Sequence, residues 1–345
     1  GRLTEVIQPA PHLASARPVT QFDYDALGNR TRITDPLGNT TVYRYDEASQ
    51  LIEIRQPDPT TGEADTGPAT SVAYRSPGLI HAITDSLGRV TSLDYDNAGN
   101  QTGVFVDGQR RLSQTYDRVG NVVMQTDALG NDTHFTYDGL HRLAETIHPD
   151  PGDGSGNPVE SLHYDLNSRI IASTDPLGRV TRHAYDAMGR QVQTEFPDGD
   201  GDGPDAPLTR DWVYDARGHV VEFSDTIGHR ITTDYDPLGR KTSSNVFNDG
   251  GVETTNYTYD AVGNLLSQRD PLGNITVWQY DDLDRVTQET DALDHSRTTT
   301  YDLAGNVTSR TDRNQRTTRF KYDHLHRLIT EKWMQSGHEI RTISY

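Results

Sequence analysis

The pair Tyr-Asp occurs thirteen times in this chain of 345 residues, and most neighbouring copies are 21 residues apart. A unit that recurs at a fixed spacing indicates a repeat architecture, in which each unit packs mainly against its neighbours. The pairs begin at Tyr24, Tyr45, Tyr95, Tyr116, Tyr137, Tyr164, Tyr185, Tyr214, Tyr235, Tyr259, Tyr280, Tyr301 and Tyr322. We therefore predict an array of similar layers rather than a fold built around one catalytic pocket.

Residues 24–46 show how one unit is built. They contain two copies of Asp-x-x-Gly-Asn, at 25–29 and 35–39, each followed by a stretch rich in Thr, Val, Tyr and Arg that favours strands. In the turn element, the Asp can accept hydrogen bonds from backbone amides ahead of it, and Pro36 suits the second position of a type I turn. Gly38 can adopt the positive φ that leads into a bulged hairpin. Each unit is predicted to hold two antiparallel strands and two tight turns, or about 28 strands in all.

The strand residues predict two different sheet faces. The third, fifth and seventh residues after a turn Gly share one face because side chains alternate along a strand. In three of the units they are Thr41-Tyr43-Tyr45, Thr133-Phe135-Tyr137 and Thr276-Trp278-Tyr280. We expect one face to be semi-apolar and to carry an aromatic ladder of Tyr rings, with each Tyr hydroxyl hydrogen-bonded to a polar neighbour. The opposite face is expected to be exposed to solvent. Sugar stacking on the Tyr rows is the alternative role.

Composition excludes several classes of protein. Asp plus Glu is 51 and Lys plus Arg is 32, a net charge of −19, so nucleic acid is not expected as a partner. Leu, Ile, Val and Phe make up about 20 % of residues, which with strict periodicity predicts thin layers and no large globular core. The absence of Cys excludes disulfides, Cys-ligated zinc and thiol catalysis. No apolar run is long enough to insert into a membrane.

The regular spacing is interrupted by Pro-, Gly- and Asp-rich stretches. Loop insertions are predicted near residues 57–70, 149–160, 197–210 and 246–255, at corresponding hairpin ends and therefore on one edge of the sheet. Residues 1–345 are otherwise expected to form a single array. Because the sequence starts and stops within the repeat register, we expect it to be a segment of a longer array.

One insertion resembles the start of a calcium-binding loop. Asp198, Asp200 and Asp202 follow the Asp-x-Asp-x-Asp pattern, but Pro204 and Thr209 occupy the seventh and twelfth positions. A calcium loop needs a bidentate Glu at the twelfth position, so a solvated acidic hairpin tip is the favoured interpretation. No His-Glu-x-x-His, Gly-x-Ser-x-Gly or phosphate-binding Gly-rich loop occurs. We therefore predict no catalytic, cofactor-binding or metal-binding residues, no cofactor and no enzymatic activity.

The repeat also resembles a known family. Tyr-Asp-x-x-Gly-Asn/Arg, with Asp-Pro-Leu-Gly-Asn/Arg-x-Thr between copies, is similar over residues 1–345 to the YD-repeat of the Rhs family. That family includes bacterial Rhs polymorphic toxins, wall-associated proteins, the B and C subunits of insecticidal toxin complexes, and teneurins. The resemblance implies a continuous spiralling sheet of β-hairpins that can close as a hollow shell or cocoon. It assigns only structural roles, to the turn Asp, the turn Gly and the Tyr, because the self-cleaving motif of some toxins is not found here.

Three functions remain open from the sequence. The best supported is a non-catalytic shell or scaffold segment of a large secreted or cell-surface protein, which encloses or displays another domain, such as a toxin effector. Its partners would then be other parts of the same polypeptide. The alternative is a carbohydrate- or cell-binding adhesion surface or an extended surface filament, with glycans or cell-surface proteins as partners. The third is an enzyme with a carboxylate pair near an insertion. A closed shell and an open ribbon are both compatible with the repeat.

Overall fold

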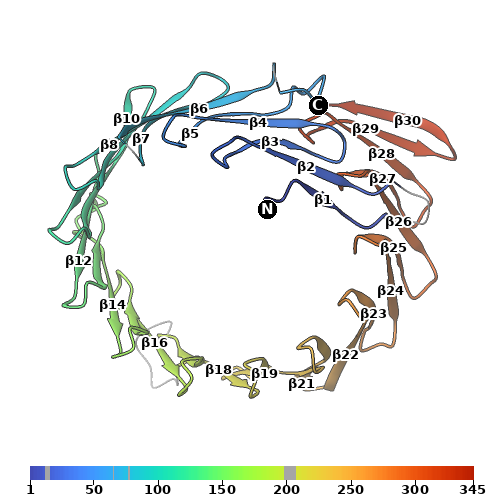
Figure 1. Cartoon of the computed structure of the whole chain (residues 1–345). Helices are drawn as coiled ribbons and strands as arrows, with labels where there is room; N and C mark the ends of the chain where they lie inside the picture. Colours follow the sequence, from blue (N-terminus) through green and yellow to red (C-terminus); the bar gives the residue numbers. More distant parts are fainter. Residues whose placement is uncertain (12–15, 65, 77, 198–206) are drawn as a thin grey trace. The chain divides into compact units, whose positions relative to one another are not determined.

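The protein is a succession of β-hairpins. The computed structural model describes residues 1–345 except 12–15, 65, 77 and 198–206. The described residues form 30 strands of one antiparallel sheet and no helix (Figure 1). The predicted all-β class and the tandem hairpins are confirmed. The strands slightly outnumber the expected two per unit, because β1 (Glu5–Ile7) and β30 (His338–Ser344) add strands at the two ends.

The described chain divides into two compact units. Unit 1 consists of Gly1–Thr91 and Tyr257–Tyr345, and unit 2 of Ser92–Asn256. The remaining strands of unit 1 are β2 (Val19–Tyr24), β3 (Arg30–Thr34), β4 (Thr40–Tyr45), β5 (Leu51–Arg55), β6 (Ala69–Ser76), β7 (Leu79–Thr84), β23 (Leu265–Arg269), β24 (Ile275–Tyr280), β25 (Val286–Thr290), β26 (Ser296–Tyr301), β27 (Val307–Thr311), β28 (Thr317–Tyr322) and β29 (Leu328–Gln335).

The strands of unit 2 follow the same pattern. They are β9 (Gln101–Val106), β10 (Gln109–Tyr116), β11 (Val122–Asp127), β12 (Asp132–Tyr137), β13 (Leu143–Ile147), β14 (Val159–Tyr164), β15 (Ile170–Thr174), β16 (Val180–Tyr185), β17 (Gln191–Glu195), β18 (Thr209–Tyr214), β19 (Val220–Asp225), β20 (Arg230–Tyr235) and β21 (Lys241–Asn248). β8 (Val90–Tyr95) and β22 (Gly251–Tyr259) cross the two unit boundaries.

Two kinds of connection alternate along each unit. The Tyr-Asp turns lead from an even-numbered strand to the next odd-numbered one, and we call this side the YD edge. The Asp-Pro-Leu-Gly turns lead from odd to even strands, and we call this side the loop edge. The connections β5–β6, β13–β14 and β17–β18, which contain the first three insertions, all leave from the loop edge. Residues 246–255 instead lengthen β21 and β22, so the extra residues there are taken up by a longer hairpin.

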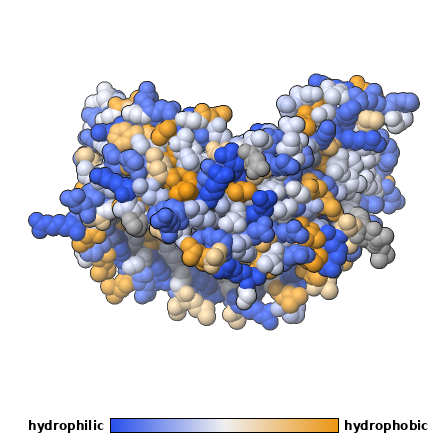
Figure 2. All heavy atoms as spheres, turned by 45° about the horizontal axis from the view of Figure 1, so that its top comes forward, coloured by the Kyte–Doolittle hydropathy of each residue, from blue (hydrophilic) through white to orange (hydrophobic). Residues whose placement is uncertain are grey.

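The two faces of the sheet differ as the alternation predicts. In β12, Thr133, Phe135 and Tyr137 are half-buried, whereas the residues between them are exposed. We call the side that carries these residues the Tyr face. In the described part of the chain, Ala64 and the prolines Pro11, Pro18 and Pro57 are the buried apolar side chains. Figure 2 shows hydrophobic residues scattered among hydrophilic ones rather than gathered in one patch. Stability therefore has to come from many small contacts between neighbouring hairpins.

Candidate functional surface

The Tyr-Asp turns are closed by their own Asp. In the turn after β12, Asp138 Oδ1 accepts hydrogen bonds from the backbone amides of Leu140 (2.9 Å) and Arg142 (3.0 Å). The amide of His141 donates to the carbonyl of Asp138, also at 3.0 Å. His141 takes the positive φ of 61° that Gly provides in most other turns, as do Ser168 and other residues. The prediction that the turn Asp caps amides ahead of it is confirmed.

In several Tyr-Asp turns the fifth residue, counted from the Asp, links successive repeats, a role that sequence reasoning missed. Arg142 Nε donates to Asp138 Oδ2 of its own turn at 2.7 Å. Its Nη1 donates to the carbonyl of Asp165 in the next Tyr-Asp turn at 2.9 Å, and its guanidinium lies 4.5 Å from the centre of the Tyr164 ring. The pairs Arg169–Tyr185, Arg190–Tyr214 and Arg285–Tyr301 repeat this arrangement. The recurring Arg or Asn at this position was the available signal.

The expected ladder of stacked Tyr rings is corrected by this geometry. Several of the repeat Tyr rings contact an Arg of the preceding turn, namely those of Tyr24, Tyr164, Tyr185, Tyr214 and Tyr301. In one repeat a His takes this place, and His219 stacks on Tyr235 with a centroid distance of 4.7 Å. Successive Tyr residues lie two strands apart, about 9.5 Å, which exceeds the reach of ring stacking. The hydroxyl part of the prediction is confirmed, because Tyr137 donates to the carbonyl of Val122 at 2.9 Å and Tyr164 to that of Leu143 at 2.8 Å.

The turn hydrogen bonds also fix the charge of the carboxylates. The side chain of Arg142, followed by its amide, holds the pKa of Asp138 below its ordinary value. In the equivalent turn of Asp215, the hydrogen bond from the His219 side chain lowers the pKa to about 2. These Asp residues are therefore ionised acceptors at neutral pH and are unsuited to act as general acids.

Segments far apart in sequence meet inside unit 1. His324 Nδ1 lies 2.6 Å from Asn39 Oδ1, and His326 Nε2 lies 2.9 Å from Asp35 Oδ2. Asn39 is only 4 % exposed, and its side-chain amide also donates to Asp35 Oδ2 at 2.7 Å. The loop-edge turn 35–39 thus shares one hydrogen-bond network with the YD-edge turn 323–327. We call this contact the seam.

Backbone bonds extend the seam. The amide of Asp282 donates to the carbonyl of Pro11, and the amide of His324 donates to that of Pro59, both at 3.2 Å. Leu37, at the tip of the 35–39 turn, is 44 % exposed, whereas Leu129 at the same position of another loop-edge turn is 87 % exposed. The seam therefore partly covers the apolar tip of the 35–39 turn, which is more open to solvent in the turn of Leu129.

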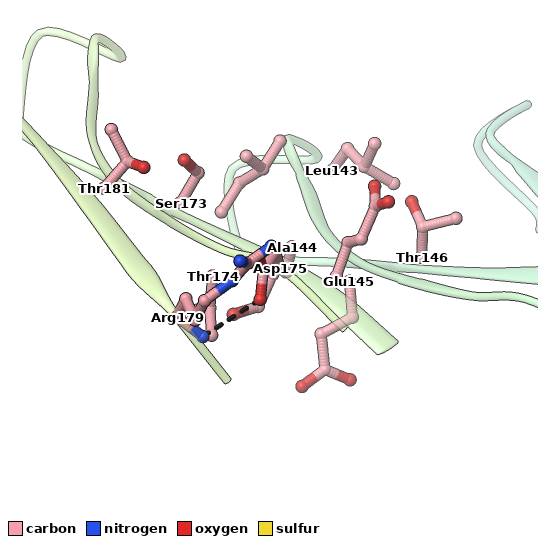
Figure 3. Close-up of a pocket in the computed structure, with 12 residues that line it drawn as sticks. Leu143, Ala144, Glu145, Thr146, Ser173, Thr174, Asp175, Arg179 and Thr181 are labelled. Carbon is pink, nitrogen blue, oxygen red and sulfur yellow. Dashed lines mark hydrogen bonds and ion pairs between the residues drawn. The ribbon is translucent and has the colours of Figure 1, made fainter. Parts of the chain in front are cut away.

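A cavity of about 240 Å³ lies on the Tyr face of unit 2. Its lining includes Leu143 and Thr146 of β13, Glu160 of β14 and Ser173 of β15, and Figure 3 shows the hydroxyl groups beside the Arg179–Asp175 ion pair. No hydrogen bond joins a lining hydroxyl to His or a carboxylate among the residues that the structure describes. The cavity therefore lacks the nucleophile–base pair of an acyl-transfer site.

No group of three His, Cys, Asp or Glu side chains within the described ranges is placed to hold a metal ion. The calcium-like stretch at Asp198, Asp200 and Asp202 lies outside the described residues. The described part of the chain contains no helix with the length and apolar character of a membrane span.

Comparisons with known proteins identify the fold and the family. The comparison with curated proteins found no match. Among solved structures, the TcdB2-TccC3-Cdc42 structure aligns over 91 % of this chain and 19 % of its own, with a TM-score of 0.62 and 16 % identity. A Tc holotoxin pore of Photorhabdus luminescens aligns over the same shares, with a TM-score of 0.61 and 16 % identity. This chain thus spans about a fifth of those chains, whose fold it shares.

The RHS Repeat family matches residues 20–61, 116–152, 164–200, 259–295 and 301–332, more than half of the sequence. The chain belongs to the RHS repeat family.

Proposed function

We propose that this chain is a non-catalytic wall segment of a larger secreted or cell-surface protein, which encloses or displays another part of the same polypeptide. The observation that carries this proposal is the use of the motif residues. The polar groups of the motif form hydrogen bonds that hold one hairpin to the next, as Asp138, Arg142 and Tyr164 show. Because these polar groups already have structural partners, the motif maintains the sheet surface and offers no group of its own for catalysis.

The solved structures support the same proposal. The similar chains belong to TcdB2-TccC3 assemblies and to a Tc holotoxin pore, and each is about five times as long as this sequence. A repeat wall in such a protein leaves most of the polypeptide for other domains. We therefore infer that delivery of a toxin-type effector is the context in which this wall acts, and that its main partners are intramolecular.

The seam supports a wall of more than one row of hairpins. In unit 1 the turns of one row partly cover an apolar turn tip of another, so row edges can be protected by further repeats rather than by a separate lid. An adhesion surface or a filament would gain nothing specific from this contact. Enclosure accordingly remains the favoured function over display to glycans or cells.

The native full-length protein provides the test. We expect electron microscopy to show a hollow particle with internal density, and limited proteolysis to spare the enclosed segment until the wall is denatured. An extended filament, or an inner segment cut as fast as in the isolated state, would overturn enclosure. Glycan-array binding by such an open particle would then support the adhesion alternative, and hydrolysis of polysaccharide or protein substrates would overturn the non-catalytic assignment.

A further inference from the structure

A second cavity, of about 250 Å³, lies on the Tyr face of unit 1. Its walls include Trp278 of β24, Glu289 of β25, Arg297 of β26 and Arg310 of β27. Glu289 is the cross-strand partner of both Trp278 and Arg297, and Arg310 is the partner of Thr299. The cavity therefore spans two neighbouring hairpins across four successive strands.

The cavity in unit 2 occupies the same place in the repeat. There, Thr146 pairs with Phe135 and Glu160, and Ser173 pairs with Leu162. The repeat thus builds one kind of depression twice and lines it differently. In unit 2 the lining holds hydroxyl and aliphatic groups together with Glu145, Glu160 and the Asp175–Arg179 ion pair, whereas in unit 1 it holds the buried carboxylate of Glu289 and two arginines. The position of Arg310 holds the neutral Ser173 in the cavity of unit 2, so the arginine at this place points to a function beyond holding the sheet together.

Two of the arginines beside this cavity are already neutralised. Glu289, 8 % exposed, accepts hydrogen bonds from Arg297 Nη2 at 2.5 Å and from Arg313 Nη2 at 2.6 Å. Trp278 Nε1 donates to the same carboxylate at 3.2 Å, which fixes the indole against the cavity. Arg313 Nε also meets Asp291 Oδ2 at 3.0 Å. Two carboxylates and two guanidinium groups therefore balance, in a network that holds the cavity wall in place.

Arg310 is the cation of the cavity lining that takes no part in this network of ion pairs. Its side chain lines the same cavity, and no hydrogen bond or ion pair to its guanidinium forms among the described residues. The chain as a whole carries a net charge of −19, and Arg310 brings a positive charge into a cavity that Trp278 lines from three strands away. A planar guanidinium with free N–H groups is suited to bidentate binding of a carboxylate.

We propose that the cavity formed by Trp278, Glu289, Arg297 and Arg310 binds a carboxylate group on a ligand portion about the size of one amino-acid residue. Arg310 grips the carboxylate, and the Trp278 ring packs against the carbon atoms that carry it. A monoanion is favoured because one cation is uncommitted, whereas a phosphate dianion would require a second. The volume lies below the range typical of drug-sized ligands, roughly 300 Å³ and above, so only a small group fits.

The test uses the fluorescence of Trp278 in the full chain with Trp212→Phe and Trp333→Phe. The probes are N-acetylglutamate α-amide, its neutral glutamine counterpart, glucuronate, glucose and inorganic phosphate. We expect a saturable response to a carboxylate probe and a response at least about tenfold weaker to its neutral counterpart, since hydrogen bonds to charged groups carry the binding. Isothermal titration calorimetry of the unaltered chain repeats the comparison without the Trp substitutions.

Two variants assign the response. Arg310→Met is expected to weaken the binding of the carboxylate probe about tenfold or more. Arg319→Met removes the same charge from the adjacent strand, at the residue paired with Ser309 on the opposite face, and is expected to leave binding unchanged. Preference for the glutamate derivative or for glucuronate would identify a peptide or a sugar acid as the source of the carboxylate. Equal responses to charged and neutral probes, equal effects of the two variants, or tighter binding of phosphate would overturn the proposal.

Discussion

In most repeats the hydroxyl group of the last tyrosine is hydrogen-bonded to a backbone carbonyl of the preceding hairpin segment. Tyr137 Oη donates to the carbonyl of Val122 at 2.9 Å, and burial, with the charge of Asp117, raises the pKa of this phenol. The hydroxyl is therefore a permanent donor over the physiological pH range. We expect Tyr137→Phe to lower the free energy of unfolding by about 0.5–1.5 kcal/mol, the usual worth of such a bond. Urea denaturation with hydrogen exchange at β11 measures the loss.

Tyr43 supplies the control for that substitution. It lies on the Tyr face of β4, with the guanidinium of Arg30 5.2 Å from its ring, and its hydroxyl forms no hydrogen bond among the described residues. Tyr43→Phe should leave stability within about 0.5 kcal/mol of the original chain. Equal losses in the two variants would show that the hydroxyl bond of the repeat Tyr carries no special weight.

Acid should loosen the turns. Hydrogen bonds within the turn lower the pKa of Asp215 to about 2 from an ordinary value of 3.8, the side chain of His219 being the largest cause. A folded-state pKa below the unfolded one gives a contribution that is complete above about pH 4 and is lost as the pH falls toward 2. The many turn Asp residues with lowered pKa values, such as Asp25 and Asp138, should act in the same direction. We expect the melting temperature to be steady near neutrality and to fall steeply below pH 4.

The Asp215 turn allows the cause to be isolated. Asn29 and Asn39 show that an amide at the fifth position can donate to the turn Asp in place of a charged group. His219→Asn should therefore keep the turn while raising the pKa of Asp215 toward its ordinary value, as followed by NMR of the side-chain carboxyl carbon. An unchanged pKa would mean that the amide of Asn, together with the backbone amides, lowers the pKa as far as the His219 side chain does.

At the scale of the element, the turn depends on one residue with positive φ. Gly178 has a φ of 79°, and no atom lies within 4 Å of the position a Cβ would take. Gly178→Ala therefore tests backbone strain without a steric clash, and should cost about 1–2 kcal/mol. Gly139, in the Tyr-Asp turn between β12 and β13, also has open space around the position of a Cβ but no positive φ.

That difference makes Gly139→Ala the matched control. It is expected to be neutral or to stabilise by up to about 1 kcal/mol, because the unfolded chain loses freedom. Thermal or urea unfolding of both variants decides the matter. A destabilisation of similar size at the two positions would contradict the strain argument.

The same turns show why sequence reasoning reached some features and not others. The roles of Asp35 and Gly38 could be predicted because each acts within five residues of chain. The role of Arg142 could not, since its partners Tyr164 and Asp165 are placed by the sheet register. The register itself shifts by a bulge beside Tyr301, so the facing of Arg310 into a cavity could not be read from alternation alone.

At the scale of the whole molecule, the seam joins residues up to 291 positions apart. Nothing in a 21-residue period specifies which rows meet, so this contact was beyond prediction from the sequence. The seam matters for stability because bringing together residues so far apart in sequence costs chain entropy, which the contacts formed must offset. Two sets of hydrogen bonds offset this entropy loss: the side-chain network at Asn39 and Asp35, and the backbone bonds from Asp282 and His324.

Removal of the two histidines should open the seam and leave the hairpins intact. In His324→Ala/His326→Ala, the rows lose the side-chain bonds to Asn39 and Asp35, so the amides of residues 282 and 324 should separate more often from the carbonyls of Pro11 and Pro59. We expect their hydrogen exchange to accelerate about tenfold or more, which corresponds to one or two lost hydrogen bonds. Exchange in β12 and β13 of unit 2 should not change.

His134→Ala is the control variant. It removes an imidazole outside the seam, on the exposed face of β12, and should leave hydrogen exchange in both regions unchanged. Unaltered exchange at Asp282 in the double variant would show that backbone bonds alone hold the rows together, and that the side-chain network contributes nothing to the seam.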